Sequence, residues 1–365
     1  MKYIVFGYFI LALVGCGQTN KLQTQDPNKG LKDYFKKYFP VGVAVNVRAL
    51  SGPDSAFITK EFNSITPEND LKIGPVHPAE NQYNWRNGDA IVAFAQRNNF
   101  KVRGHNLVWH YESQTPKWIF LDKDGNQASK ELVLQRLKDH ITTVVNRYKG
   151  KIYAWDVANE VISDKQDEYL RPSDWYKICG EDYILKAFQW AHEADPNALL
   201  FYNDYNEIDA TKREKIFRLV KSLKDRGIPV HGLGLQAHWA NNEPSREQLD
   251  STLKRFSQLG VQLHITEFDI SVYPKEHNAR PRITEDDNAA FTPERETAQI
   301  EKYKMCFEMF KKYRKFITSV TFWNLSDRSS WLDNFPVQRR KDYPLLFDQN
   351  MKPKKAYWEV VKVVQ

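Results

Sequence analysis

Short apolar segments alternate with segments of helical character along almost the whole chain, and this alternation limits the possible folds more than any other feature. The apolar segments are rich in β-branched and aromatic residues, which predicts buried strands. We expect strands at residues 41–46, 61–66, 101–109, 152–160, 198–202, 232–238, 264–269 and 316–323. Apolar residues at helical spacing predict helices at residues 31–39, 88–98, 130–148, 181–194, 211–226, 245–259, 294–313 and 355–363.

Strands that alternate with helices predict a parallel sheet with helical crossovers. Eight such repeats favour a single closed (β/α)8 barrel, the TIM barrel of the α/β class, over an open doubly wound sheet. The open sheet usually carries a glycine-rich phosphate loop after its first strand, and none follows residues 41–46. The 365 residues could form two domains, but one barrel takes up about 250 residues or more. We therefore expect one barrel domain over residues 31–365.

The first 16 residues have the pattern of a bacterial lipoprotein signal peptide. A lysine precedes an apolar stretch from Tyr3 to Val14, which is too short for a spanning helix. The stretch leads into Leu-Val-Gly-Cys, which resembles a lipobox, so we expect Cys16 to carry the lipid anchor. An ordinary cleaved secretory signal is the alternative. Residues 17–30 are polar and predict a flexible tether. We expect an exported lipoprotein of the outer membrane, on its periplasmic or cell-surface face, attached through the lipid alone.

The remaining cysteines and the charge distribution indicate no further covalent framework and no nucleic-acid partner. Cys179 and Cys306 lie far apart in the sequence, and we expect buried free thiols. The net charge is +7, but lysines and arginines are interleaved with acidic residues, and no basic run contains aromatic residues. We expect a solvated surface and a monomer.

Two glutamates 107 residues apart, Glu160 and Glu267, each lie at the end of an apolar run. A TIM barrel carries its chemistry at the carboxyl ends of its strands. The fourth and seventh strands would bring these carboxylates together across the barrel mouth. Glycoside hydrolysis requires such a pair, with one carboxylic acid to protonate the leaving oxygen and one carboxylate to attack the sugar. In a retaining enzyme the two are about 5 to 5.5 Å apart.

Neighbouring polar residues support this interpretation. Asn159 precedes Glu160, and its amide can hold the sugar 2-hydroxyl. His238 ends the sixth expected strand, and Asp269 lies two residues beyond Glu267 on the same strand face. A chain from Asp269 through His238 to Glu267 would orient the imidazole and keep the carboxylate ionised. A core histidine or a metal ligand is the alternative for His238, although no HExxH motif or Cys/His cluster supports a metal.

The other expected strand ends are also polar and aromatic. This mixture of amides, carboxylates, a lysine and indoles is typical of sites for neutral, hydroxyl-rich ligands. The residues are Glu68, Asn69, Lys72, His105, Trp109, His110, Asn203, Asp204, Tyr205, Asn206, Gln236, Trp323 and Trp331.

From residue 31 to the C-terminus the chain resembles glycoside hydrolase family 10, the retaining endo-β-1,4-xylanases. The resemblance rests on motifs at 42–46 (GVAVN), 66–69 (TPEN), 103–110 (RGHNLVWH), 155–160 (WDVANE), 203–206 (NDYN), 232–238 (GLGLQAH), 265–269 (ITEFD) and 327–332 (DRSSWL). It implies that Glu160 is the acid/base, that Glu267 is the nucleophile, and that the substrate is xylan or a xylo-oligosaccharide, cut internally without a cofactor. It places Tyr205 on the leaving-group side. The residues implied for the glycone subsites are Glu68, Asn69, Lys72, His105, Trp109, Asn159, Gln236, His238, Trp323 and Trp331.

The chain departs from the family pattern at several positions. Tyr111 and Glu112 intervene between His110 and Ser-Gln-Thr-Pro, which would move Gln114, a further expected substrate-binding residue, and add a charge near the glycone end. Ile73, Phe268 and Asn324 stand where Trp or Pro, Leu and Gly are usual. These departures bear on subsite preference and leave both glutamates in place. Two alternatives remain: the same machinery acting on another β-glycan such as a β-glucan, or a non-catalytic glycan-binding surface lipoprotein.

Overall fold

The computed structural model describes residues 26, 28–281 and 290–365 of the chain. The expected signal peptide, Cys16 and most of the expected tether lie outside the described residues. Within them, no helix is both long enough and apolar enough to cross a bilayer.

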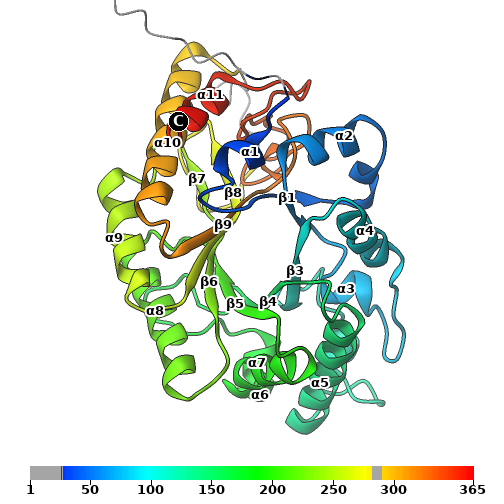
Figure 1. Cartoon of the computed structure of the whole chain (residues 1–365). Coiled ribbons are helices and arrows are strands. Elements are labelled where there is room, and N and C mark those ends of the chain that lie inside the picture. The colour runs from blue at the N-terminus through cyan, green and yellow to red at the C-terminus, as the bar shows by residue number, and fades with distance from the viewer. Residues whose placement is uncertain (1–25, 27, 282–289) are drawn as a thin grey trace, which may run out of the picture.

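Parallel strands form a closed ring with the helices outside it (Figure 1). The strands are β1 (Val41–Val45), β2 (Ser64–Pro67), β3 (Lys101–Val108), β4 (Ala154–Asn159), β5 (Leu199–Asp204), β6 (Gly232–Leu235), β7 (His238–Ala240), β8 (Gln262–Ser271) and β9 (Ile317–Phe322). Strand order runs from β6 back to β1 and then through β9 to β8, and pairing of β6 with β8 closes the barrel. The short β7 extends the pairing along β8. The expected single (β/α)8 barrel is confirmed.

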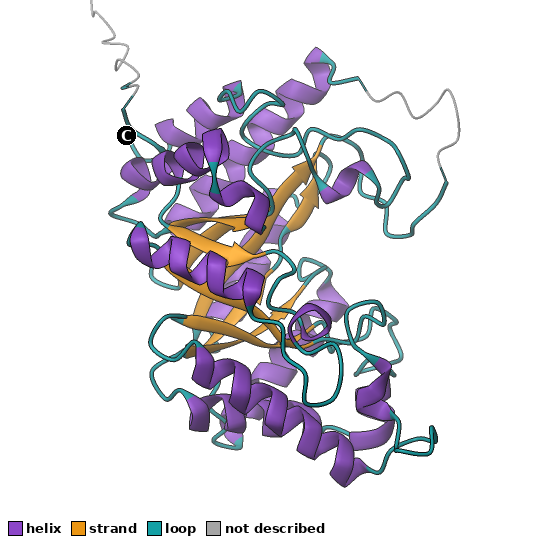
Figure 2. Ribbon diagram, turned by 90° about the vertical axis from the view of Figure 1, so that its right-hand side faces the viewer, coloured by secondary structure: helices purple, strands orange, loops and turns teal. Residues whose placement is uncertain are grey.

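Helices surround the strands on the outside of the barrel (Figure 2). The helices are α1 (Leu31–Phe35), α2 (Gly52–Glu61), α3 (Ile73–Val76), α4 (Arg86–Arg97), α5 (Lys130–Arg147), α6 (Asp174–Cys179), α7 (Asp182–Ala194), α8 (Ala210–Asp225), α9 (Arg246–Ser257), α10 (Pro293–Lys312) and α11 (Lys355–Lys362). Short 3-10 helices are η1 (Val47–Leu50), η2 (Lys117–Phe120) and η3 (Trp331–Asp333).

Local sequence explains where these helices start and which face they bury. Helix α8 begins where the side chain of Asp209 accepts a hydrogen bond from the backbone N–H of Lys212 at 2.8 Å, which satisfies one of the free donors of the first turn. Its buried residues, such as Ile216, Leu219 and Leu223, follow a helical period and form the face that packs inward. Cys179 and Cys306 are buried free thiols, as expected.

Several expected boundaries are wrong. The second strand starts at Ser64, because α2 continues to Glu61, and the first helix ends at Phe35. The sixth expected strand, residues 232–238, is two strands, because Ala237 takes a φ of +58° between β6 and β7. The break turns the chain at Gln236, so that β7 pairs with the outer end of β8, beyond the part of β8 that pairs with β6.

Candidate active site

Glu160 lies at the carboxyl end of a barrel strand, and Glu267 lies in the carboxyl-terminal half of another. Glu160 directly follows β4 and is partly buried, whereas Glu267 lies in β8 and is 5% exposed. Strands β5 and β6 separate β4 from β8 in the barrel. The loops and strand ends on this side of the sheet therefore supply the surroundings of both carboxylates.

Glu160 is held through both its backbone and its carboxylate. Its φ angle of +56° is costly for a residue with a side chain. Its N–H donates to the carbonyl of Asn203 at 2.9 Å, and its carbonyl accepts from Nε of Arg171 at 3.1 Å. Its Oε2 accepts from Nε1 of Trp109 at 2.8 Å, and its Oε1 accepts from Nε2 of Gln236 at 2.9 Å. These contacts stabilise the unusual backbone and fix the direction of the carboxylate.

His238 lies between the carboxylates of Glu267 and Asp269. Its Nε2 is 3.2 Å from Oε2 of Glu267, and its Nδ1 is 3.0 Å from Oδ2 of Asp269. The indole Nε1 of Trp331 also donates to Oδ2 of Asp269 at 2.8 Å. The expected chain of contacts from Asp269 to Glu267 is confirmed.

These contacts determine the charges of His238 and Glu267. Burial by itself would lower the pKa of His238, but Asp269 and Glu267 raise it to about 10. Burial would likewise raise the pKa of Glu267, but the hydrogen bond from His238, the nearby His105 and a hydrogen bond from Asn203 lower it to about 2. At neutral pH the site thus holds an imidazolium beside an ionised Glu267.

Two side-chain amides connect the surroundings of Glu267 and Glu160. Nδ2 of Asn203 donates to Oε1 of Glu267 and to Oδ1 of Asn159, both at 2.9 Å. Nε2 of Gln236 lies 3.4 Å from the same Oδ1 and donates to Glu160. Oδ1 of Asn159 is therefore occupied as an acceptor by Asn203 and Gln236. The two carboxylates therefore belong to one hydrogen-bonded set of side chains.

Lys72 faces the same carboxylates from the loop after β2. Its Nζ donates to Oδ1 of Asn69 at 2.9 Å and lies 4.6 Å from the ring centroid of Trp109. Burial lowers the pKa of Lys72, while both candidate catalytic glutamates and Glu68 oppose that change. Lys72 is thus a second basic group, besides His238, near the two glutamates.

His105 is positioned by a buried ion pair in the barrel. Its Nδ1 lies 3.0 Å from Oδ2 of Asp156, which also accepts from Nε of Arg103 at 3.1 Å. Trp323 meets the ring of His105 edge to face at 5.3 Å and that of His238 at 6.4 Å. Trp323 therefore lies between His105 of β3 and His238 of β7.

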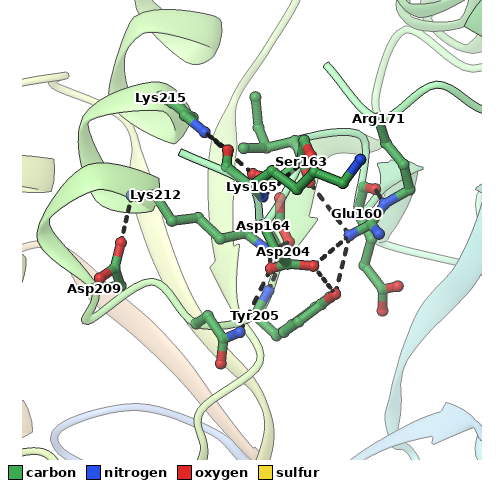
Figure 3. Close-up of polar contacts among 12 residues, drawn as sticks. Glu160, Ser163, Asp164, Lys165, Arg171, Asp204, Tyr205, Asp209, Lys212 and Lys215 are labelled. Carbon is green, nitrogen blue, oxygen red and sulfur yellow. Dashed lines mark hydrogen bonds and ion pairs between the residues drawn. The ribbon is translucent and has the colours of Figure 1, made fainter. Parts of the chain in front are cut away.

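Asp164 is the centre of a second polar cluster, which reaches Glu160 through Arg171 (Figure 3). It accepts from Nζ of Lys212 at 2.6 Å, from Arg171 at 2.9 Å and from the hydroxyl of Tyr205. Lys212 also pairs with buried Asp204 at 3.1 Å. Burial would raise the pKa of Asp164, but Lys212, Tyr205 and Arg171 hold it well below its usual range. An ionised carboxylate thus anchors Tyr205, the residue expected on the leaving-group side.

Gln114 is the expected site residue with least connection to the others. Its backbone carbonyl accepts from the N–H of Gly74 at 2.8 Å, which ties its loop to α3. Its side-chain Oε1 is buried and has no hydrogen-bond partner among the described residues. Its expected role in substrate binding stays a prediction.

Three further residues make contacts that hold the site together: Asn203, Arg171 and Asp164. Asn203 is one of the polar strand-end residues expected from the sequence, whereas Arg171 and Asp164 are not predicted. For Asn203 a signal exists, since it occupies a buried strand end in register with Asn159. Arg171 and Asp164 lie in the irregular segment between β4 and α6. No local pattern there distinguishes them from surface charges.

No group of three or more His, Cys, Asp or Glu side chains suited to a metal ion occurs in the part of the chain that the structure describes.

Comparisons with known proteins agree on one family. The family model described as glycosyl hydrolase family 10 matches residues 30–363. Endo-1,4-beta-xylanase B of Paenibacillus barcinonensis is 48% identical over 340 residues, covering 93% of this chain and 99% of that protein. The endo-1,4-beta-xylanase of Geobacillus stearothermophilus is 46% identical over 335 residues, covering 91% and 98%.

Solved structures lead to the same group. The crystal structure of xylanase XynB from Paenibacillus barcinonensis with a conduramine derivative has a TM-score of 0.86 and 47% identity, covering 92% of this chain and 99% of that chain. A mutant protein solved in complex with xylotriose has a TM-score of 0.85 and 42% identity, covering 91% and 99%.

Proposed function

The chain belongs to glycosyl hydrolase family 10, and from this membership and the geometry of its site we propose a retaining endo-β-1,4-xylanase with Glu160 as acid/base and Glu267 as nucleophile. The observation that carries the division of roles is the difference between the two carboxylates. Glu267 is ionised and held by His238 and Asn203. Glu160 accepts from neutral donors, Trp109 and Gln236.

In the first step, a carboxylate oxygen of Glu267 attacks the anomeric carbon of a xylose unit. Glu160 gives its proton to the glycosidic oxygen as the bond to the leaving chain breaks. The product is a xylosyl ester on Glu267 and a free chain end. His238, kept as an imidazolium between two carboxylates, supports the ionised form of Glu267 before the attack.

In the second step, Glu160, now ionised, takes a proton from water. The water oxygen attacks the same anomeric carbon and displaces Glu267 as a carboxylate. Two displacements at one carbon retain its configuration. The NH2 group of Asn159 is suited to hold the 2-hydroxyl of the reacting sugar, because its amide oxygen is engaged by Asn203.

The substrate is xylan, by similarity to the endo-1,4-beta-xylanases of the comparison. The remaining expected residues line the glycone side in this proposal, with Lys72, Asn69 and Glu68 as hydrogen-bonding groups and Trp323 and Trp331 as flat surfaces. Discrimination against glucan depends on steric rejection of its extra hydroxymethyl group.

The purified mature chain and its Glu267→Ala variant test this function on linear xylan, arabinoxylan, glucuronoxylan and β-glucan. We expect wild-type protein to release mixed internal fragments from xylans, and the variant to lose on the order of 10⁴-fold or more in turnover while keeping its circular dichroism spectrum. Glu301→Ala, on an exposed position of α10, is the control. Undiminished turnover of Glu267→Ala would contradict the mechanism, and faster glucan than xylan cleavage would contradict the substrate. Glycan binding without release of reducing ends would favour a binding protein.

We also propose that the protein is an exported lipoprotein anchored through Cys16 to the outer membrane. The support is the sequence alone: an apolar stretch followed by Leu-Val-Gly-Cys. Labelling with a radioactive fatty acid should mark the full-length chain and not Cys16→Ala. Equal labelling of both would contradict the anchor.

A further inference from the structure

A groove runs beside the candidate active site between the loop after β3 and the loop after β4. It has a volume of about 530 Å³, and its lining includes His110, Tyr111, Glu112, Arg171, Asp174 and Lys177. A second hollow of about 270 Å³ shares His110, Glu112 and Asp174 with it. Tyr111 and Glu112 are the two residues by which this chain departs from the family pattern between His110 and Ser113.

Two residues that line the groove, Tyr111 and Arg171, are connected to the acid/base. Tyr111 stacks on Trp109 with ring centroids 5.0 Å apart and an interplanar angle of 20°, and Trp109 donates to the carboxylate of Glu160. Arg171 donates to the backbone carbonyl of Glu160. Arg171 also donates to the hydroxyl of Tyr205, the residue expected on the leaving-group side, at 2.9 Å. Although the sequence places Tyr111 and Glu112 near the glycone end, the contact of Arg171 with Tyr205 therefore connects the groove to the leaving-group side.

The ring of Tyr111 offers a surface that a sugar can use. It is 53% exposed, which is unusual for a large aromatic side chain. Since Trp109 covers one face of the ring, the exposed area belongs to its other face and its edge. Aromatic rings with one free face pack against the apolar C–H faces of sugars, while polar groups around them fix the hydroxyls.

The charges around the groove balance. The lining contains two cations, Arg171 and Lys177, and two carboxylates, Glu112 and Asp174. Lys177 pairs with Asp174 at 3.4 Å, and Arg171 pairs with Asp164, outside the lining, at 2.9 Å. Burial and the nearby Arg171 lower the pKa of His110 to about 3, so its ring is neutral. Its buried Nδ1 has no hydrogen-bond partner among the described residues. A neutral ligand rich in hydroxyls fits this surface better than an anion.

We propose that this groove binds a neutral sugar unit of the leaving-group half of the substrate, with Tyr111 as its platform. The proposal rests on the proposed function and deepens it, because it names a binding site outside the residues expected for the reacting sugars. The sugar is either a further backbone unit of the leaving chain or a neutral branch on that chain. Tyr111 is then a specificity-determining residue.

Substrates with one glycone and different leaving groups test the proposal. Linear xylo-oligosaccharides cleaved to release one to four xylose units, and oligosaccharides with an arabinose branch on the leaving chain, supply the two neutral sources. The readout is the ratio of kcat/KM for each longer or branched oligosaccharide to kcat/KM for the oligosaccharide that releases one unbranched xylose unit. Both leaving groups are sugar hydroxyls that need the same proton, so this ratio divides out general damage to Trp109 or Glu160.

Tyr111→Ala should lower this ratio about three- to tenfold, as expected for loss of one aromatic packing contact, and Tyr111→Phe should not. The arm in which the ratio falls identifies the sugar as backbone or branch. The matched control is Phe335→Ala, which removes an exposed ring stacked on Trp331 at 5.3 Å and 20°. It should change kcat/KM for all substrates by one factor.

Two results would overturn the proposal. The first is an unchanged ratio in both neutral arms for Tyr111→Ala while the wild-type protein cleaves xylan. The second is a selective loss on glucuronate-branched oligosaccharides in Lys177→Glu with no effect of Tyr111→Ala on neutral ones, which would assign the groove to an anion. Absence of xylan cleavage by the wild-type protein would instead contradict the proposed function.

Discussion

The side-chain nitrogen of Asn203 lies 2.9 Å from Oε1 of Glu267 and commits its second hydrogen to Oδ1 of Asn159. Its Oδ1 accepts from the hydroxyl of Thr266 at 2.7 Å. Both hydrogens and the oxygen of this buried amide are thus engaged, so its orientation is fixed. Asn203 joins the ends of β4, β5 and β8, and with them the nucleophile and the residue next to the acid/base.

Replacement of Asn203 should impair catalysis without unfolding the barrel. Asn203→Ala removes a hydrogen bond to a charged group and leaves Asn159 free to rotate, so kcat/KM on xylan should fall about 10- to 100-fold. Asn203→Asp keeps the shape but places a like charge beside Glu267, and should lose more activity at pH 7 than at pH 5, where its own protonation relieves the repulsion. Steady-state kinetics at both pH values measure the difference. Wild-type activity in both variants would show that the bridge is dispensable.

The contact between His238 and Glu267 predicts a pH effect with a defined sign. His238 helps to lower the pKa of Glu267 from 4.5 to about 2. In His238→Asn the imidazolium is lost, so this pKa should rise toward its ordinary value and a larger fraction of the nucleophile should be protonated below pH 5. The acid limb of the kcat/KM profile should therefore move to higher pH.

Profiles between pH 3 and pH 7 on an aryl β-xylobioside measure this shift. Trp331→Phe is the control, because it removes the indole hydrogen bond to Asp269 but leaves the imidazolium of His238 in place, and it should move the acid limb less. An acid limb that stays in place in His238→Asn would mean that His238 does not control ionisation of the nucleophile.

The barrel and the pair of glutamates could be predicted because each depends on a local pattern. Strand periodicity and the polar residue at a strand end are both visible in the sequence around Glu160 and Glu267. The break at Ala237 was not predicted, since GLGLQAH reads as one apolar run and the turn at +58° is imposed by pairing of β7 with β8. Arg171 was not predicted, because its contact with the site is a hydrogen bond to the backbone carbonyl of Glu160, 11 residues away in the sequence. No pattern of side chains in the sequence indicates a contact with a backbone carbonyl.

Arg171 should matter most when the leaving group needs a proton. It clamps the carbonyl of Glu160, whose φ is left-handed, so Arg171→Lys should misplace the acid/base. General acid catalysis contributes about 10²- to 10⁴-fold. We expect kcat/KM for phenyl β-xylobioside to fall about tenfold more than kcat/KM for the dinitrophenyl analogue, whose leaving group departs without protonation.

Lys215→Ala is the matched control for Arg171→Lys. Lys215 is a cation at the outer edge of the cluster in Figure 3, and it donates to the backbone carbonyls of Lys165 and Glu168. Its loss should affect both aryl substrates equally. An equal effect of Arg171→Lys on the two substrates would show that this residue does not act through the acid/base.

The buried histidine pair His77 and His140 predicts acid sensitivity of the fold. Their Nδ1 atoms are 3.3 Å apart, so one ring donates and the other accepts while both are neutral. Burial lowers their pKa values to about 4 and about 3. The unfolded chain takes up protons near pH 6.5 whereas the folded chain resists until about pH 4, so acidification favours unfolding. The stability present above pH 6.5 should fall by about 3 kcal/mol for each of the two histidines as the pH reaches 4.

His140→Gln cannot titrate and can still donate to Nδ1 of His77. Its melting temperature should be lower than that of the wild-type protein at pH 7, but should fall less between pH 6.5 and pH 4, with each kcal/mol equivalent to roughly 2 to 4 °C. The exposed His277→Gln should keep the wild-type slope. Thermal unfolding followed by circular dichroism at stepped pH measures both slopes. Removal of one proton-accepting ring from the pair must reduce the difference in proton uptake between the folded and unfolded chains. If the melting temperature of His140→Gln fell with pH as steeply as that of the wild-type protein, the acid sensitivity would therefore come from other buried groups.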